Sequence, residues 1–267
     1  MSSLFSYEFM RLAFAAVLLI TPLLGILGTM VVRKKMAFFS DALGHSALTG
    51  IALGLFLGIS DPSLSMVIYG IVFAVLLTTI QRRNLSSTDT IISVFASGST
   101  AIGLAILSHG GNFSNYSALL IGDILSIKKS EVLWLLVILC VTVVFWILAV
   151  NRLNAISIHA TLARSANIQV KLIEDIFSIL IAVVVMLSIR WIGILLISAL
   201  MIIPPASSAN ISQNMREYHL YSIIFAVFSG VVGLIVSYYT NVATGPMIVI
   251  IAAVIYFAAY LYGRKGK

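Results

Sequence analysis

Residues 37–59, "AFFSDALGHSALTGIALGLFLGI", form an apolar run long enough to cross a lipid bilayer as a helix. The run follows the basic cluster Arg33-Lys34-Lys35, and two ionisable residues, Asp41 and His45, interrupt it near its start. Ionisable side chains inside a membrane are costly and usually belong to a pathway or a binding site. The run therefore predicts a membrane span that carries a functional pair of side chains.

The rest of the chain has the same apolar character. Of its 267 residues, 61% are hydrophobic and only 9% are charged, and the mean hydropathy is +1.12. Soluble domains have about a quarter of their residues charged, whereas uncharged stretches of roughly 20 residues recur along this chain. We therefore predict an all-α polytopic membrane protein with a single transmembrane domain over residues 1–267. The runs lack the alternating pattern of a membrane β-barrel.

The apolar runs give nine predicted spans, with eight as the alternative count. The predicted spans cover residues 10–32, 37–59, 63–81, 88–107, 131–150, 172–189, 191–210, 218–239 and 245–262.

The positions of the basic residues predict the orientation of these spans. With the N-terminus outside and the C-terminus in the cytoplasm, twelve of the sixteen basic residues fall on the inner face, which agrees with the positive-inside rule. They are Arg33, Lys34, Lys35, Arg82, Arg83, Arg152, Arg164, Lys171, Arg216, Arg264, Lys265 and Lys267. The net charge of +7 is thus explained by the lipid bilayer, and nucleic acid is not expected as a partner.

Two connections between the spans contain apolar residues. Residues 116–127 are too short to span comfortably, and a crossing there would move residues 151–171 and their basic side chains outside. We therefore expect 116–127 to form a short outer helix that lies in or dips into the membrane. Residues 151–171 form the longest inner connection. From composition, a connecting loop is favoured over a docking surface for a cytoplasmic partner.

The spacing of Asp41 and His45 predicts a shared site. Residues four apart lie on one face of a helix, and a carboxylate oxygen and an imidazole nitrogen there can bind one divalent ion. Gly50, Gly54 and Gly58 fall roughly 180–260° around the helix from Asp41. We expect this glycine face to pack against a neighbouring helix. The opposite face, which also carries Leu48 and Ala52, would then show its ligands to a cavity.

Two structural roles for the pair remain open at this point. Asp41 could hydrogen-bond His45 or a neighbouring helix and hold the bundle together, or it could cap the N-terminus of the helix. Two ligands are also too few for a tight site, since zinc is usually held by about four. In a homodimer the second copy would double the set, and weak binding suits an ion that must leave again.

Other polar residues are weaker candidates. His109, Asp123 and His159 are expected at the surface, and Tyr218-His219 at a membrane interface. Pro204-Pro205 is expected to break the span 191–210 near its inner end, as a kink with freed carbonyls. The sequence contains neither the phosphate-binding GxxxxGK[ST] nor the hydrolase motifs HExxH and GxSxG. We therefore expect a passive pathway, not an enzyme, with energy supplied elsewhere.

Five stretches together resemble the membrane permeases of bacterial ABC importers for zinc, manganese and iron. They are "RKKMAFFSDALGHSALTGIALG" (33–54), "STDTIISVFASGSTAIGLAI" (87–106), "IGDILSI" (121–127), "IRWIGILLISALMIIPPASSANIS" (189–212) and "YYTNVATGPMIVI" (238–250). The resemblance covers nearly the whole chain, and it implies the fold of the cobalamin-type (type II) importers in a bacterial plasma membrane. Two positions depart from the family pattern: Gly44 replaces the usual serine, and Thr49 replaces a proline, which should leave the helix less kinked.

The resemblance also implies partners and a site. It implies a homodimer of permeases, a dimer of cytoplasmic ATPases docked around Ser157–Ile168, and an extracytoplasmic metal-binding protein. This reverses the preference from composition for a mere connecting loop. The family's metal-coordinating pair falls on Asp41 and His45, where zinc or manganese would pass as substrate, with no permanently bound cofactor. The alternative function is a stand-alone secondary metal-ion transporter.

Overall fold

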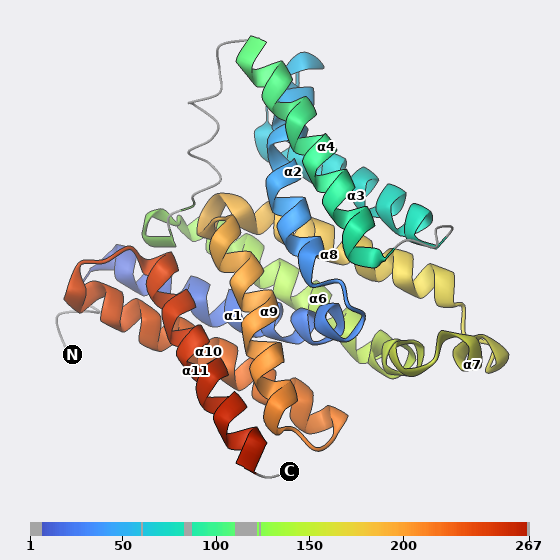
Figure 1. Ribbon diagram of the computed structural model, residues 1–267. Helices are drawn as coiled ribbons and strands as arrows, with labels where there is room; N and C mark the ends of the chain where they lie inside the picture. Colours follow the sequence, from blue (N-terminus) through green and yellow to red (C-terminus); the bar gives the residue numbers. More distant parts are fainter. Residues whose placement is uncertain (1–6, 60, 83–86, 110–121, 123, 266–267) are drawn as a thin grey trace. The chain divides into compact units, whose positions relative to one another are not determined.

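The computed structural model describes residues 7–59, 61–82, 87–109, 122 and 124–265, and the regular structure of this part is helical (Figure 1). The long helices are α1 (Glu8–Arg33), α2 (Ala37–Phe56), α3 (Pro62–Gln81), α4 (Thr88–His109), α6 (Lys129–Ile158), α8 (Val170–Ile192), α9 (Ile194–Ile211), α10 (Met215–Thr240) and α11 (Thr244–Lys265). Two short elements, η2 (Ile124–Ser126) and α7 (Ala160–Ser165), also lie in the described part.

These helices fall on the predicted spans. Within the described residues, eight of them are long and apolar enough to cross a membrane. The long helix outside that set is α2, because Asp41 and His45 lower its hydropathy. The prediction of nine spans, or eight, is confirmed. The predicted outer helix 116–127 lies outside the described residues except for Gly122 and the short stretch that contains η2.

Helix α6 is longer than predicted. The apolar run ends near residue 150, but the helix continues to Ile158 and takes up the first part of the expected inner connection. Its 30 residues correspond to a length of about 45 Å, which exceeds the roughly 30 Å hydrocarbon core. The polar residues Asn151, Arg152 and Asn154 extend the helix without extending the hydropathy signal.

The chain forms two compact units, which are described separately, and a single domain over 1–267 stays a prediction. The first unit comprises Met1–Val32, Asp123–Val143 and Trp191–Lys267. In it, α9, α10 and α11 pack on one another, and α1 packs closely against α10. The hydroxyl of Ser222 donates to the carbonyl of Gly25 at 2.7 Å, and the hydroxyl of Tyr218 donates to the carbonyl of Thr29 at 3.1 Å.

The helix is not interrupted at Pro204-Pro205, because α9 continues through both prolines to Ile211, and the expected kink stays a prediction. Pro205 has no N–H to donate to the carbonyl of Met201 one turn earlier. In the structure Gly28 of α1 lies against this carbonyl and the Pro205 ring, and a side chain on Gly28 would meet the ring at 2.8 Å. Close packing against a glycine accommodates the freed carbonyl, so the helix need not end.

The second unit comprises Arg33–Gly122 and Val144–Arg190. Helix α2 packs against both α3 and α4. Lys35, with φ 56°, separates α1 from α2. Asp61 caps α3 by accepting a hydrogen bond from the backbone of Ser63 at 2.9 Å, and Pro62 occupies the first helical position, where its missing N–H costs nothing. Both candidate ligands, Asp41 and His45, belong to this unit.

Candidate functional site

Asp41 and His45 lie on the first half of α2 and point out of the packed part of the second unit. The Nε2 atom of His45 is 3.7 Å from the Oδ1 atom of Asp41, and the side chains are 57% and 44% exposed, respectively. This distance is that of an ion pair and is too long for a hydrogen bond. The two ligand atoms are therefore close together on the same side of α2, but they are not hydrogen-bonded to each other.

The capping role for Asp41 is wrong. The N-cap of α2 is Met36, and Asp41 is the fifth residue of the helix, beyond the turn whose backbone N–H groups need a cap. The helix runs without interruption through Thr49, in agreement with the expected loss of the proline kink. The carboxylate is thus held on a regular helix one turn before the imidazole.

The predicted glycine face is confirmed for two of its three members. A side chain on Gly50 would meet Met66 and Tyr69 of α3 at 3.0 Å, and Gly54 lies against Ser65 of the same helix. Gly58 lies beyond the end of α2, has φ +75° and contacts no other element closely. The small residues therefore let α2 and α3 approach through the two helical positions only.

The half of the opposite face that carries Leu48 and Ala52 is packed against a neighbouring helix. Leu48 and Ala52 are 7% and 0% exposed and form a cluster with Leu107 of α4. The two apolar residues therefore pack against a neighbouring helix, and Ala52 also lines a cavity of about 500 Å³ with residues of α4. The half of this face that carries Asp41 and His45 is the more exposed one.

The arrangement offers one nitrogen and one carboxylate ligand to a divalent ion. Among the described residues, no group of three or more His, Cys, Asp or Glu side chains could hold a metal. The part of the chain that the structure describes thus brings only these two side chains together, and water, backbone oxygens or another copy of the chain can supply further ligands. Such a two-residue site suits brief binding better than permanent retention.

The other polar candidates are not gathered at this pair. His109 is exposed at the end of α4, and His159 is exposed at the start of α7. His219 belongs to the first unit, where its Nδ1 atom lies 2.9 Å from the hydroxyl of Thr29. Asp123 lies outside the described residues. The position of His219 matches an interhelical contact, not a surface site.

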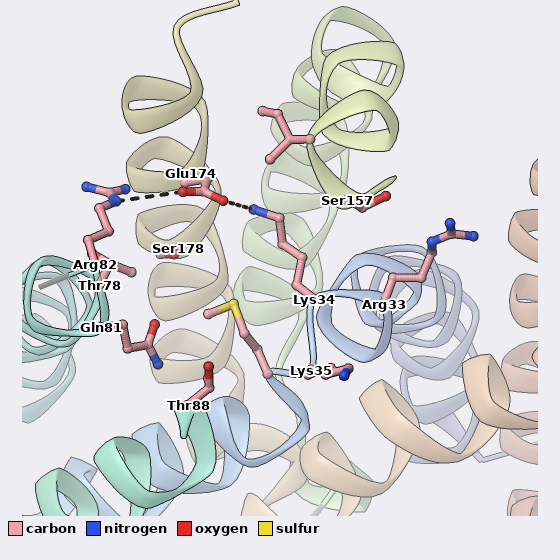
Figure 2. A pocket seen from close by; sticks show the side chains of 12 residues that line it. Arg33, Lys34, Lys35, Thr78, Gln81, Arg82, Thr88, Ser157, Glu174 and Ser178 are labelled. Atoms are coloured by element: carbon pink, nitrogen blue, oxygen red, sulfur yellow. Dashed lines mark hydrogen bonds and ion pairs between the residues drawn. The ribbon is translucent and has the colours of Figure 1, made fainter. Parts of the chain in front are cut away.

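The second unit contains a second group of charges that the sequence did not predict as a cluster (Figure 2). The Nζ atom of Lys34 lies 2.7 Å from Oε1 of Glu174, and the Nε atom of Arg82 lies 3.7 Å from Oε2 of the same residue. Arg82 also contacts Asp175 at 2.6 Å and donates to the carbonyl of Lys171 at 3.1 Å. We call Lys34, Arg82, Glu174 and Asp175 the ion-pair cluster.

The ion-pair cluster lies at a cavity of about 340 Å³. The cavity is lined by residues from both ends of the turn between α1 and α2, from the end of α3, the start of α4, the end of α6 and the start of α8. Figure 2 shows Lys34 and Arg82 reaching Glu174 from opposite sides. The charges were visible in the sequence at span ends, but their partners are 140 and 93 residues away along the chain.

Residues Ser157–Ile168 contain the end of α6, the short helix α7 and the turn that follows it. Ile158 and Leu162 are both 66% exposed, whereas Ala163 is buried. The carbonyl of Ala163 accepts a hydrogen bond from the backbone of Ile168, and Asn167 has a positive φ of 59°, so the turn folds back on α7. The segment is therefore a short helix with an exposed apolar side, not an irregular loop.

Known proteins resemble this chain over almost its full length. Residues 6–263 match the ABC 3 transport family. The chain is 30% identical over 247 residues to the high-affinity zinc uptake system membrane protein ZnuB of Haemophilus influenzae, which covers 90% of this chain and 91% of the relative. It is 23% identical over 266 residues to the manganese transport system membrane protein MntC of Listeria monocytogenes, with 99% and 94% covered.

The fold also has a solved counterpart. The structure of PsaBC from Streptococcus pneumoniae in complex with Fab superposes with a TM-score of 0.83 at 22% identity, and the match covers 97% of this chain and 93% of that one. This likeness confirms the predicted fold class. The eight apolar helices and the membrane relatives identify a multi-pass membrane protein. Because the family match spans nearly every residue, the chain belongs to the ABC 3 transport family.

Proposed function

We propose that this chain is the membrane-spanning permease of an ABC importer that moves a divalent metal ion, zinc or manganese, into the cytoplasm. The observation that carries the proposal is the open Asp41–His45 pair on α2, with its ligand atoms 3.7 Å apart. The names of the relatives, one a zinc and one a manganese system, support a metal substrate. Carboxylate with imidazole suits both ions, so the pair is consistent with either.

The exposure of the pair supports a homodimer. Two charged or polar side chains that are about half exposed in one copy would face lipid if the chain were alone, which is unfavourable. A second copy related by two-fold symmetry would present the same pair and give four ligands. Asp41 and His45 would thus form a transient site for the ion within the pathway.

Energy for transport would come from a separate ATPase, since the sequence has no phosphate-binding loop of its own. The docking segment is Ser157–Ile168. Its exposed Ile158 and Leu162 offer an apolar contact next to the basic Arg164. The chain connects α7 directly to α6 and α8. Movement of the ATPase against α7 can therefore be transmitted to these two membrane helices.

The cavity at the ion-pair cluster supports the prediction that several helix ends share one side of the membrane. The helix ends that line it are all predicted to lie on the cytoplasmic side: those near Lys34, Arg82, Thr88, Ser157 and Glu174. Since α4 begins and α6 ends at this cavity, the two helices cross in opposite directions. This agrees with an N-terminus outside and a C-terminus inside a bacterial plasma membrane. An extracytoplasmic metal-binding protein would then deliver the ion to the outer side.

The test is metal uptake into proteoliposomes that hold this chain, its ATPase and its binding protein, with zinc and manganese in competition. We expect uptake that requires ATP and both partners, with one metal preferred. Uptake that proceeds without ATP and follows an ion gradient would contradict the proposal and favour a stand-alone secondary transporter. The absence of any metal flux under all conditions would contradict both functions.

A further inference from the structure

Three hydroxyl groups from three helices meet one turn after His45. The hydroxyl of Thr49 on α2 donates to the backbone carbonyl of Ser99 on α4 at 2.5 Å. The hydroxyl of Ser99 lies 3.2 Å from that of Thr49 and 2.5 Å from the hydroxyl of Tyr69 on α3. Thr49 and Ser99 are 1% and 7% exposed, so water does not compete freely for these bonds.

The backbone carbonyl of Ser99, where this chain of hydrogen bonds ends, fixes which hydroxyl donates in each bond. A backbone carbonyl can only accept, so the proton of Thr49 is used on the carbonyl of Ser99. Ser99 must then donate its proton to the Thr49 oxygen, and Tyr69 must donate to Ser99. Each hydroxyl therefore gives its one proton to a defined partner, and the group ties α2 to α3 and α4 in a single arrangement.

The three helices also pack closely at this place. A side chain on Gly103 of α4 would meet the Cα and N atoms of Thr49 at 2.8 Å. The neighbouring Gly50 is in close contact with α3 on the other side of α2. Contacts of backbone against backbone, together with the hydroxyl group, leave α2 little freedom to rotate at residue 49.

Asp41, His45 and Thr49 are each four residues apart, so they follow one another along one face of α2. Thr49 is about 6 Å along the helix axis from His45. A rotation of α2 by about 10° would move an atom about 6 Å from the axis by about 1 Å. Metal–ligand distances tolerate only about 0.2 Å. Because Asp41 and His45 lie on the same helix, this rotation moves them together. It therefore decides where the pair stands relative to ligands from outside α2, such as the same pair of a second copy.

We propose that Thr49, through its bonds to Ser99 and Tyr69, is a positioning residue that sets the direction of Asp41 and His45 toward the metal. This inference rests on the proposed function, because it concerns the same metal pair. Thr49 does not contact the ion itself. It acts by fixing the rotation of α2, which carries both ligands. Groups that orient metal ligands in this way typically change metal affinity by about 10- to 100-fold when removed.

The experiment measures binding of Co²⁺ alone to the intact complex in lipid nanodiscs, by equilibrium dialysis and by the visible absorption of the bound ion. Thr49→Val keeps the shape of the side chain and removes the hydroxyl, whereas Thr49→Ser keeps the hydroxyl. The matched control is Thr21→Val in the first unit, where a buried hydroxyl donates to Val17 of its own helix at 2.8 Å. Asp41→Asn with His45→Gln removes the ligands.

We expect Thr49→Val to weaken Co²⁺ binding by about 10- to 100-fold and to change the absorption bands, because the ligand geometry changes. Thr49→Ser should restore wild-type binding, and Thr21→Val should not alter it. Tyr69→Phe should have a smaller effect, since the bond from Thr49 to Ser99 remains. If Thr49→Val fails to assemble, Tyr69→Phe must still shift the bands for the inference to stand.

The outcomes separate this inference from the proposed function. Wild-type Co²⁺ affinity and bands in Thr49→Val, with only a lower melting temperature, would overturn the positioning role and leave a purely structural one. If the variant without Asp41 and His45 ligands binds Co²⁺ as the wild type does, or if the wild type does not bind it, the metal site itself is wrong. Both proposals would then fall together.

Discussion

The second unit holds two groups of charged side chains that are built in opposite ways. In the ion-pair cluster, Lys34 is 9% exposed and contacts Glu174 at 2.7 Å, and Arg82 contacts Asp175 at 2.6 Å. In the Asp41–His45 pair the side chains are about half exposed and 3.7 Å apart. The cluster pairs its charges closely within itself, whereas Asp41 and His45 lie farther apart and are more exposed. We expect this difference to separate a structural role from the proposed binding role.

The largest expected effect comes from removing one ligand of the pair. Asp41→Asn or His45→Gln should reduce ATP-dependent metal uptake by about 100-fold or more, since either change takes away half of the ligands that this chain provides. The melting temperature of the complex should stay within a few degrees of the wild type, because these side chains contribute little packing. Uptake in proteoliposomes and thermal unfolding of the same preparations check this.

A fall in stability as large as the fall in uptake would contradict the comparison, because the pair would then be structural like the ion-pair cluster. Leu48→Ala on the same helix serves as the reference for a true packing defect. Leu48 is 7% exposed and packs on Leu107, so its truncation should lower stability by about 2–5 kcal/mol.

The next effect concerns the ion-pair cluster. Glu174→Gln leaves the nearly buried ammonium of Lys34 without its carboxylate, and we expect a loss of about 2 kcal/mol in stability. Uptake per folded complex should remain near the wild-type value. Thermal unfolding gives the first quantity, and uptake normalised to assembled complex gives the second.

The double variant Lys34→Gln with Glu174→Gln sharpens this test. It removes the stranded charge as well as its partner, so it should be more stable than Glu174→Gln alone. A double variant that is less stable than the single one would mean that Lys34 is held by contacts other than Glu174. Arg82 loses its contact with Glu174 in both variants and keeps Asp175, so its contribution cancels when the two variants are compared.

The last effect concerns the packed half of α2. Gly103→Ala would force a methyl group against Thr49 and should cost about 1–3 kcal/mol in stability. Gly98→Ala on the same helix meets nothing within 4 Å and should be neutral or slightly stabilising, since alanine favours helix. Equal unfolding temperatures for the two variants would show that α2 and α4 are not closely packed at Thr49.

The sequence predicted the helices well because hydropathy is a local property. Apolar runs located every long helix, and four-residue spacing was enough to place Asp41 and His45 on one face. The end of α6 was missed because Asn151 and Arg152 end the apolar signal but not the helix. The unbroken α9 could not be predicted because the contact of Pro205 with Gly28 cannot be seen in either segment alone.

Contacts between distant segments could not be predicted from the sequence. Lys34 and Glu174 are each ordinary span-end charges, and nothing in one stretch identifies the other as its partner. The same holds for Thr49 and Ser99, which are common small polar residues until α2 and α4 are seen to touch. Helical spacing placed Leu48 and Ala52 on the face opposite the glycines, but it does not tell which neighbouring helix covers that side.

The length of α6 has a consequence for the surrounding lipid. The helix is continuous from Lys129 to Ile158, and α7 begins two residues later. A helix longer than the hydrocarbon core adapts to bilayer thickness by tilting. Because the far end of this helix leads directly into α7, a change in tilt displaces α7 as well. Hydrophobic mismatch would thus act on α7: lipid chain length would adjust how this short helix is presented, without any change in the protein.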